Sequence, residues 1–383
     1  MVEWKKLGEV CQVLNGFAFK SSEYVPEGIR IIRISDVQNG YISDKDKVFY
    51  PIEKLSEFEK YILNNGDLVM SLTGNPGRVA FIRTESCALN QRVACLRAKT
   101  VSNSYLFYLF NCKEFESTAF ANSSGGAQKN LSTTWLNNFL IPIPSLSEQQ
   151  RIVGILDTFT ASIDNLKEQI AQRRKQYEYY RDQLLDLEGK PGVEMKTLGE
   201  VCKKTNNIKW KQESSNKEYK YIDLSSVCIE NNQIEGTVII NKENAPSRAQ
   251  QVVNLNDVLL GTTRPTLKRY CQINEQYDNQ ICSTGYCVFR ANKSIVLSRW
   301  IYHNIGAPNF WDYCEANQKG AGYPCLSNSD AFAYSIPVPS LQEQQRIVSI
   351  LDTFEASIQN LEAQLKQREK QYEYYRNKLL TFE

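Results

Sequence analysis

The strongest pattern of hydrophobic and polar positions in this chain is a seven-residue repeat, and it occurs twice. In each run, large side chains recur at alternating steps of four and three residues, which is typical of the apolar face of a coiled-coil helix. The first run consists of Ile152, Leu156, Phe159, Ile163, Leu166, Ile170, Arg173, Tyr177, Tyr180, Leu184 and Leu187, and the second of Ile347, Leu351, Phe354, Ile358, Leu361, Leu365, Arg368, Tyr372, Tyr375, Leu379 and Phe382. About 40 residues at 1.5 Å per residue predict roughly 60 Å of helix for each run.

The two runs lie inside a longer duplicated segment. Residues 141–188 and 336–383 align without a gap, with 34 identical residues in 48 positions. Each copy opens on Ile-Pro-x-Pro-Ser-Leu, which places prolines where a helix can begin, and each carries Lys-Gln-Tyr-Glu-Tyr-Tyr-Arg near its end. Gly154 is the only glycine that interrupts either run. We therefore expect two long helices, over residues 144–188 and 339–383.

A polar residue stands on the apolar face at the same place in both copies. Arg173 and Arg368 each occupy a position that the repeat otherwise gives to a large apolar or aromatic residue. A polar residue on such a face often fixes the register or orientation of a helix pair. Alternatively, each arginine extends out of the apolar face into solvent.

The stretches before the two helices form a second, fainter repeat. Leu-Gly-Glu-Val-Cys begins at Leu7 and again at Leu198, and each stretch carries a late loop of small residues that closes on Leu-Ser. Residues 1–143 and 189–338 are therefore predicted to be two related globular domains. The helices are alike while the domains have diverged, as expected of one scaffold that carries two different recognition domains.

The globular domains show a mixed pattern of short β-rich and helical runs. In the first domain, the runs at residues 29–34, 67–72, 79–82 and 93–96 alternate with Gly, Asn and Pro turns, which predicts strands. Short helices are predicted at residues 105–110 in the first domain and 298–305 in the second. Each domain is thus expected to belong to the α+β class, with a curved antiparallel sheet.

The order of these elements restricts how the two helices can run. If the second domain is compact, its two ends lie close together, so the end of the first helix lies near the start of the second. The helices are then antiparallel, the globular domains lie at opposite ends of the pair, and a pseudo-twofold axis relates the halves. Packing the two apolar faces together buries surface that neither helix could bury alone.

Composition sets the class of protein. The chain has 383 residues, more than one ordinary core requires, with 42% hydrophobic and 23% charged residues. No apolar run reaches 18 residues and none follows the charged N-terminus, so we expect neither a membrane span nor a signal peptide. The eleven cysteines include no Cys-x-x-Cys pair and are expected to be reduced thiols in a cytoplasmic protein.

Motifs for catalysis are missing from the sequence. His303 is the single histidine, so no metal site can be built from several histidines, and the cysteines lack the spacing of zinc ligands. There is no GxxxxGK[ST] phosphate loop, no GxGxxG cofactor loop and no Asn-Pro-Pro-aromatic run of an amino-methyltransferase. We therefore expect a non-catalytic chain that holds no metal or cofactor of its own.

Two unlike binding domains held a fixed distance apart suit DNA, whose major groove presents successive faces about 34 Å apart. The net charge is only +2, with +2 over residues 1–143 and +3 over 189–338, which permits nucleic-acid binding without proving it. Loop side chains that could pair with base edges or hold phosphates are Arg78, Gln91, Arg92, Gln128 and Lys129 in the first domain and Thr263, Arg264, Lys268, Arg269 and Lys319 in the second. For each, the alternative is an ordinary solvated surface side chain.

Part of the helical sequence is identical in both copies at positions predicted to be exposed. These positions are Glu148, Gln149, Gln150, Arg151, Glu343, Gln344, Gln345 and Arg346. A surface repeated in this way would fit two copies of one partner placed around a pseudo-twofold axis. Helix capping explains part of the identity as well.

In its order of reader, helix, reader and helix, the chain resembles the specificity subunit of a type I restriction–modification system over its full length. The resemblance is carried by Ile-Pro-Ile-Pro-Ser-Leu-Ser-Glu-Gln-Gln-Arg-Ile-Val at residues 141–153, with a second copy at 336–348. It is also carried by Leu-Gly-Glu-Val from Leu7 and Gly-Asp-Leu-Val from Gly66.

This resemblance implies that each target-recognition domain reads one half of a bipartite, asymmetric site in double-stranded DNA through the major groove. The helices would set the gap between the half-sites and dock two methyltransferase subunits, which bring S-adenosylmethionine and the catalytic residues. Restriction subunits, the ATP-dependent translocase and nuclease, would join with ATP and Mg²⁺. The alternatives are a coiled-coil scaffold whose two domains bind protein, and a stand-alone enzyme.

Overall fold

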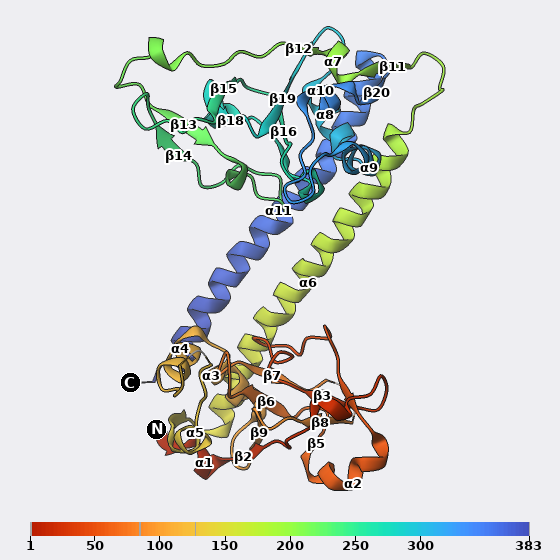
Figure 1. The fold of residues 1–383 in the computed structure, drawn as a ribbon. Coiled ribbons are helices and arrows are strands. Elements are labelled where there is room, and N and C mark those ends of the chain that lie inside the picture. Colours follow the sequence, from red (N-terminus) through yellow and green to blue (C-terminus); the bar gives the residue numbers. More distant parts are fainter. Residues whose placement is uncertain (1, 84–85, 127, 383) are drawn as a thin grey trace. The chain divides into compact units, whose positions relative to one another are not determined.

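The computed structural model describes residues 2–83, 86–126 and 128–382 (Figure 1). The chain divides into two compact units: unit 1 is Met1–Leu166 with Gln364–Glu383, and unit 2 is Lys167–Ala363. Each unit therefore holds one globular domain together with a part of each long helix.

The two long helices are present where the heptad repeats predict them. Helices α6 (Leu146–Leu185) and α11 (Leu341–Leu380) are each 40 residues long. Each begins just after its proline segment, where the Ser145 hydroxyl accepts the Glu148 N–H and the Ser340 hydroxyl accepts the Glu343 N–H, both at 3.3 Å. These serines satisfy backbone donors that a helix start leaves unpaired.

Unit 1 contains the four strands that the sequence predicts in the first domain. Its elements are β1 (Glu3–Lys6), α1 (Leu7–Val10), β2 (Cys11–Asn15), η1 (Ser21–Glu23), β3 (Ile29–Ile32), β4 (Phe49–Tyr50), η2 (Ile52–Lys54), α2 (Leu55–Phe58), η3 (Glu59–Tyr61), β5 (Ile62–Leu63), β6 (Leu68–Ser71), β7 (Val79–Phe81), β8 (Cys87–Leu89), β9 (Val93–Ala98), α3 (Asn103–Phe110), α4 (Lys113–Ala121), α5 (Thr133–Asn138) and β10 (Leu140–Ile143). The predicted strands correspond to β3, β6, β7 and β9, and the predicted short helix corresponds to α3, so these predictions are confirmed.

The strands of unit 1 form layers. One sheet has the order β2-β9-β6-β7 and is antiparallel, a second has the order β4-β3-β8-β5, and β1 pairs with β10. Alternate residues of β6 face opposite sides, because successive side chains of a strand point to opposite faces. Leu68 and Met70 pack with the helices, whereas Val69 packs between the two sheets. The first sheet is thus buried on both faces.

Unit 2 repeats this architecture. Its elements are β11 (Glu194–Thr197), α7 (Leu198–Val201), β12 (Cys202–Lys203), η4 (Trp210–Gln212), β13 (Tyr219–Ile222), η5 (Leu224–Ser226), β14 (Val238–Ile240), β15 (Ala249–Val253), β16 (Val258–Gly261), η6 (Pro265–Leu267), β17 (Tyr270–Gln272), η7 (Glu275–Tyr277), β18 (Gln280–Ser283), β19 (Tyr286–Ala291), α8 (Ser298–Ile305), α9 (Pro308–Asn317), α10 (Asn328–Ala333) and β20 (Ser335–Val338). The orders β12-β19-β16-β17, β14-β13-β18-β15 and β11-β20 match those of unit 1 strand for strand. Helix α8 confirms the predicted short helix of the second domain.

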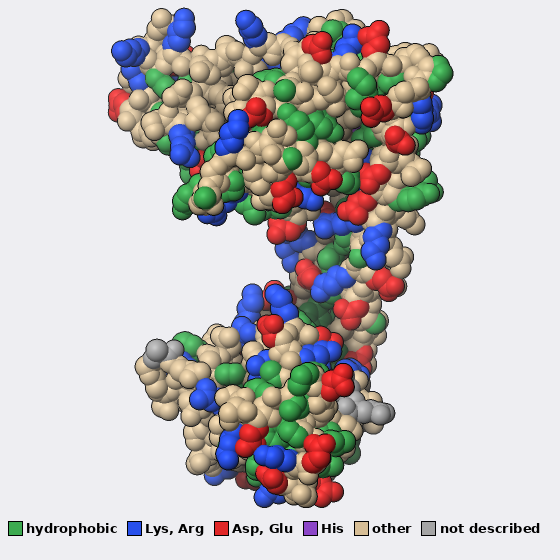
Figure 2. All heavy atoms as spheres, turned by 45° about the vertical axis from the view of Figure 1, so that its right-hand side comes forward, with side chains coloured by type: hydrophobic (Ala, Val, Ile, Leu, Met, Phe, Trp, Pro, Cys, Tyr) green, Lys and Arg blue, Asp and Glu red, His purple; other side chains and the backbone are tan. Residues whose placement is uncertain are grey.

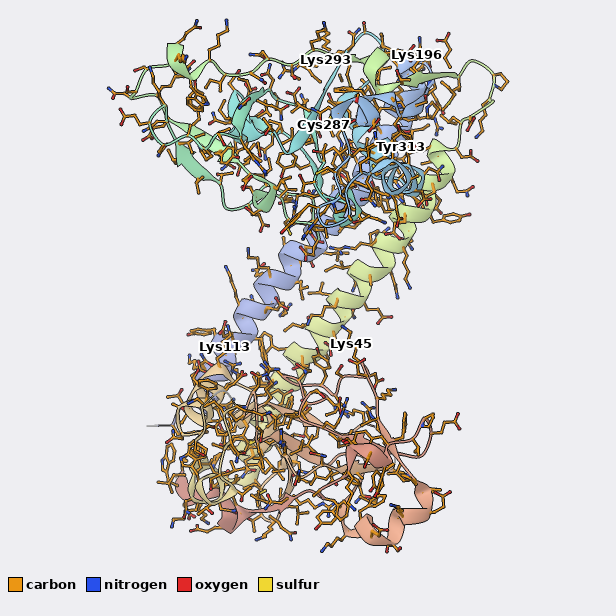
Figure 3. The ribbon with its side chains drawn as sticks, in the orientation of Figure 1. Lys45, Lys113, Lys196, Cys287, Lys293 and Tyr313 are labelled. Carbon is orange, nitrogen blue, oxygen red and sulfur yellow. The ribbon has the colours of Figure 1, made fainter. Side chains whose placement is uncertain are left out.

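In unit 2 as well, the burial of a side chain depends on the layer in which it lies. Cys287 on β19 is fully buried between the sheet and the helices, whereas Lys196 on β11 and Lys293 after β19 lie at the periphery (Figure 3). No disulfide joins cysteines in the described residues.

The prediction of a single antiparallel sheet in each domain is wrong in two respects. Each domain has two four-stranded sheets, and the second sheet contains a parallel pair, β3 with β8 in unit 1 and β13 with β18 in unit 2. The parallel partners are far apart in sequence, as parallel pairing requires a long crossover. The α+β class is unaffected.

The two long helices contact each other in each unit, through aromatic and charged side chains. In unit 2, Arg174 of α6 reaches Glu362 of α11 at 2.6 Å, while Tyr180, further along α6, stacks on Phe354, earlier in α11, with ring centroids 5.3 Å apart. From Arg174 to Tyr180 the residue number rises along α6, whereas their partners on α11 run from Glu362 back to Phe354. The two segments are therefore antiparallel within this unit.

Candidate nucleic-acid interface

Three polar loops meet beside the first sheet of unit 1. Gly74 N–H donates to Lys129 O at 2.9 Å, and Leu72 N–H donates to Arg92 O at 3.0 Å. These bonds join the loop after β6 to the loop between α4 and α5 and to the turn between β8 and β9. The structure therefore brings together segments from which the sequence nominated DNA contacts.

All five candidates in this domain lie in these loops, and four of them come from the late loop and from the turn between β8 and β9. Gln91, Arg92 and Gln128 are exposed, and the Arg92 guanidinium donates to the Gln128 side-chain oxygen at 3.4 Å. Lys129 is half-buried, with its ammonium 5.5 Å from the centre of the Phe120 ring. Arg92 and Gln128 thus form one exposed polar pair.

Arg78 differs from the other candidates of unit 1. It is half-buried, and its guanidinium donates to Gln38 at 3.0 Å and to Glu116 at 3.3 Å. These partners already use part of its hydrogen-bonding capacity. A contact with DNA through Arg78 stays a prediction, and it would require sharing or breaking the Glu116 ion pair.

The same junction of loops occurs in unit 2. Arg264 N–H donates to Pro324 O at 2.7 Å, and Leu326 N–H donates to Thr262 O at 2.9 Å. Thr263 lies at this junction and is half-buried beside Cys325, whose thiol is 3.7 Å from the Thr263 hydroxyl. The loop after β16 and the loop between α9 and α10 are joined in this way, as their counterparts are in unit 1.

The basic candidates of unit 2 have unlike surroundings. Arg264 and Lys268 are exposed, and both have left-handed backbone conformations, with φ of 51° and 53°. Arg269 is half-buried and donates to Val227 O at 3.2 Å. Lys319 is exposed and lies 3.4 Å from Asp330. Exposed ion pairs of this kind contribute little stability, so Lys319 is free to exchange partners.

Sequence reasoning missed Tyr323, which lies in the same loop as Lys319. Its side chain is 73% exposed, and the Arg264 guanidinium lies 4.6 Å from the centre of its ring. Aligning the late loops of the two domains would have placed Tyr323 opposite the nominated Gln128. On the face shown in Figure 2, basic and acidic side chains are interspersed over each unit, in keeping with the small net charge.

Two of the nominated docking residues are not on an exposed face, and that part of the prediction is wrong. Gln149 is 1% exposed and Gln344 is 0% exposed. The Gln344 amide donates to Pro339 O and Ile295 O and accepts from Leu297 N–H, at 2.9 to 3.0 Å. These groups would otherwise be unsatisfied in the interior, so the glutamine attaches the start of α11 to its own domain.

The remaining docking candidates are at the surface. Glu148 accepts two hydrogen bonds from Arg151, at 2.8 and 2.7 Å, and Glu343 with Arg346 repeats this geometry. In each pair the arginine's hydrogen bonds lower the pKa of the glutamate. The capping role belongs to the serine three residues earlier, and within the described residues each glutamate side chain is paired with the arginine. Gln150 and Gln345 are exposed beside these pairs.

A buried polar network attaches α11 to α8 in unit 2. His303 is fully buried, with one ring nitrogen 2.8 Å from Asp352 and the other 3.0 Å from the Tyr177 hydroxyl. Arg299 joins Asp352 at 2.6 Å and also pairs with Glu355. Burial lowers the pKa of His303; burial opposes ionisation of Asp352, but hydrogen bonds from His303 and Arg299 hold its pKa below the usual value. The single histidine is therefore a packed, hydrogen-bonded residue of the interior of unit 2.

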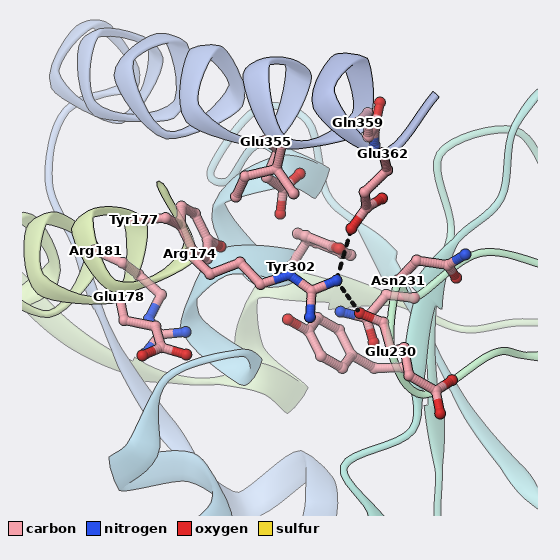
Figure 4. Close-up of a pocket in the computed structure, with 13 residues that line it drawn as sticks. Arg174, Tyr177, Glu178, Arg181, Glu230, Asn231, Tyr302, Glu355, Gln359 and Glu362 are labelled. Carbon is pink, nitrogen blue, oxygen red and sulfur yellow. Dashed lines mark hydrogen bonds and ion pairs between the residues drawn. The ribbon is translucent and has the colours of Figure 1, made fainter. Parts of the chain in front are cut away.

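A cavity of about 210 Å³ in unit 2 lies between α6, α11 and the loop near Glu230 (Figure 4). Arg174 crosses it and donates to the Glu362 carboxylate at 2.6 Å and to Glu230 O at 3.2 Å. Tyr302 and Tyr177 line the same space. The arginine bridges the two helices and the domain, which accounts for the polar residues gathered there.

Across the part of the chain that the structure describes, no three His, Cys, Asp or Glu side chains are placed to hold a metal ion. Among the described helices, none is long and apolar enough to cross a membrane.

A family model of the type I restriction modification DNA specificity domain matches residues 1–173 and again residues 191–369, which is most of the chain. The chain belongs to the type I restriction–modification DNA specificity family. Its function is therefore DNA specificity within a type I restriction–modification system. Each match covers one globular domain and the first part of the long helix that follows it.

Known members of this family are similar over most of the chain. The specificity subunit of the type I restriction enzyme EcoR124I/EcoR124II from Escherichia coli is 29% identical over 327 residues, which cover 78% of this chain and 76% of that one. The EcoBI specificity subunit, also from Escherichia coli, is 24% identical and covers 94% of this chain and 80% of its own length. The crystal structure of a type I system S subunit from M. genitalium superposes with a TM-score of 0.61 at 15% identity, covering 100% of this chain and 97% of that one, which shows a shared fold.

Proposed function

We propose that this chain is the non-catalytic subunit that reads a bipartite, asymmetric DNA site and assembles with the modification and restriction subunits of its system. Residues 1–143 and 189–338 would each read one half-site. The helical segments, residues 144–188 and 339–383, would form the antiparallel spacer between them, related by a pseudo-twofold axis.

One observation carries this proposal. The two domains share every sheet order and the same three-loop junction, which in unit 2 is completed by Thr262 N–H donating to Gly285 O at 2.9 Å. The exposed side chains at that junction nevertheless differ: Arg92 with Gln128 in unit 1, Arg264 with Tyr323 in unit 2. A conserved scaffold with different exposed groups is what two readers of different sequences require. A protein scaffold with two identical clients would not need this difference.

The catalytic groups and their cofactors are proposed to reside on partners. Two methyltransferase subunits would bring S-adenosylmethionine, and restriction subunits would bring ATP and Mg²⁺. The exposed Glu148–Arg151 and Glu343–Arg346 pairs, with Gln150 and Gln345, remain our candidates for docking the two methyltransferase copies, because they are presented identically on both helices.

The test is a DNA-binding measurement on the full chain assembled with its methyltransferase subunits. Modification mapping in cells that carry the complete system identifies the site, and affinity is then measured over a salt series. We expect specific binding whose logarithm falls linearly with the logarithm of salt concentration, because basic residues displace counterions from phosphates. A scaffold that binds only protein would show neither a sequence preference nor this dependence.

A further inference from the structure

Matching backbone bonds make Arg264 the counterpart of Gly74. Gly74 N–H donates to Lys129 O in unit 1, and Arg264 N–H donates to Pro324 O in unit 2. Both residues have left-handed backbones, with φ of 79° and 51°. Glycine adopts this conformation freely, whereas a side chain with a Cβ is disfavoured there. An arginine at a position that suits glycine points to a use for its side chain.

The Arg264 side chain is exposed and uncommitted. Its guanidinium stacks over the Tyr323 ring at 4.6 Å, and within the described residues it makes no hydrogen bond or ion pair. Arg269 and Arg290, by contrast, are bonded to a carbonyl or a carboxylate of their own domain. Stacking on an aromatic ring fixes the plane of a guanidinium and leaves its N–H edge available.

The same loop position supports an arginine in the other domain. Lys129 O and Pro324 O accept the matching backbone bonds, so the residues directly before them, Gln128 and Tyr323, are counterparts. Gln128 accepts a hydrogen bond from Arg92 at 3.4 Å. The late loop therefore carries the supporting residue in both domains. The arginine itself comes from the loop after β16 in unit 2 and from the turn between β8 and β9 in unit 1.

We propose that Arg264, oriented by Tyr323, reads a guanine in the major groove of the half-site bound by the second domain, and that Arg92 with Gln128 does so in the first. The inference rests on the proposed DNA-reading function. A guanidinium edge matches the O6 and N7 acceptors of guanine, and this pairing distinguishes guanine from the other bases. Tyr323 and Gln128 are positioning residues.

Arg264→Gly is the decisive variant, introduced into cells that carry the complete system. Glycine suits φ of 51°, so the variant should fold at least as well as the parent chain. We expect genome-wide mapping of modified sites to show that one G·C pair in one half-site is no longer required. Discrimination against the other base pairs at that position should fall roughly 5- to 150-fold. The other half-site should stay unchanged. Tyr323→Leu should relax the same base pair, and Tyr323→Phe, which keeps the ring, should not.

Two further left-handed positions provide matched controls. Lys268→Gly relieves the same backbone strain at φ of 53° and should weaken binding evenly over all sequences, as loss of a phosphate contact does. Asn279→Gly, at φ of 57° outside these loops, should leave the modified sequence and the affinity unchanged. An Arg264→Gly chain that modifies the parent sequence with undiminished selectivity would overturn the inference. Failure of the parent chain to direct any sequence-specific modification would instead overturn the proposed function.

Discussion

Gln149 and Gln344 show that a residue can be identical in two copies without facing a partner. Each lies within the first turn of a long helix and turns its amide inward, where Gln149 donates to Pro144 O and accepts from Ser102 N–H. The identity of these residues follows from the same internal attachment made twice. The exposed Glu148 and Arg151 lack such an explanation, and they remain better candidates for contact with another subunit.

The contribution of the Gln344 hydrogen bonds to the stability of the chain can be measured. We expect Gln344→Ala to lower the free energy of unfolding by about 1–3 kcal/mol, because it leaves a buried N–H and two carbonyls without partners. Chemical denaturation of the full chain provides the measurement. Gln345→Ala, at the neighbouring exposed position, is the control and should change stability by less than about 0.5 kcal/mol. Equal effects of the two substitutions would contradict the buried role.

His303 should make unit 2 sensitive to mild acid. Its pKa is lowered by burial, with Asp352, Arg299, Glu355 and Tyr177 around the ring. Below the usual value of 6.5 the unfolded chain binds a proton that the folded chain does not, so stability falls as pH decreases through that region. The depressed pKa of Asp352 adds a loss only at lower pH, below its usual value of 3.8.

Thermal unfolding between about pH 7.5 and about pH 5 tests this expectation. The parent chain should lose stability on acidification, and His303→Gln should show a flatter dependence while being less stable at neutral pH. A parent chain and variant with the same slope would show that His303 does not titrate differently in the folded state.

At the scale of elements, the arginines on the apolar faces take part in a repeated aromatic contact. Arg173 of α6 lies 5.8 Å from the Phe354 ring of α11, and Tyr180 stacks on the same ring. In unit 1 the helices exchange roles, because Arg368 of α11 lies 5.8 Å from the Phe159 ring of α6. Neither arginine simply extends into solvent, which favours the register role that the heptad pattern suggested.

Replacing both arginines with leucine tests that role. Each cation–π contact is worth about 0.5–1 kcal/mol at an exposed site, and leucine restores apolar contact, so stability should change little. The helices of the Arg173→Leu/Arg368→Leu chain should instead sample additional registers, seen as new lysine cross-links by mass spectrometry. Gln172→Leu, at the neighbouring exposed position whose side chain bonds Glu168 of its own helix, should keep the parent cross-links. An unchanged pattern in the double variant would remove the register role.

At the scale of the whole molecule, the proposed function makes the helices a spacer. Within unit 1 Phe159 of α6 stacks on Tyr375 of α11, and within unit 2 Tyr180 of α6 stacks on Phe354 of α11. Residues 164–170 of α6 and 364–370 of α11 each lie between these contacts in the sequence, and each segment is one heptad long. Deleting both heptads keeps the apolar faces in phase and shortens each helix by about 10 Å. That length corresponds to about three base pairs of DNA.

The shortened chain should no longer direct modification of the parent site, because the half-sites would lie at the wrong separation and angle. Modification mapping provides the measurement. Circular dichroism and thermal unfolding should show intact helices and domains, which separates a spacing defect from a folding defect. Undiminished modification of the parent site would contradict the spacer role.

The sequence alone was sufficient for the long helices, the duplication and several strands. Heptad spacing in α6, or the run of apolar residues around Val69 in β6, is a signal between near neighbours in the chain, and local geometry converts it directly into helix or strand. The family resemblance likewise rests on contiguous motifs. These features could be predicted because each depends on residues that are close in sequence.

Only the tertiary structure decided which polar residues are buried and which loops meet. Gln344 looks exposed by pattern, yet it bonds Ile295 and Leu297, 49 and 47 residues away. The pairing of Arg264 with Tyr323 and the parallel pair in each second sheet also join distant segments. Such contacts depend on the spatial arrangement of the completed sheets, since a polar side chain carries no local signal for the distant group that will satisfy it.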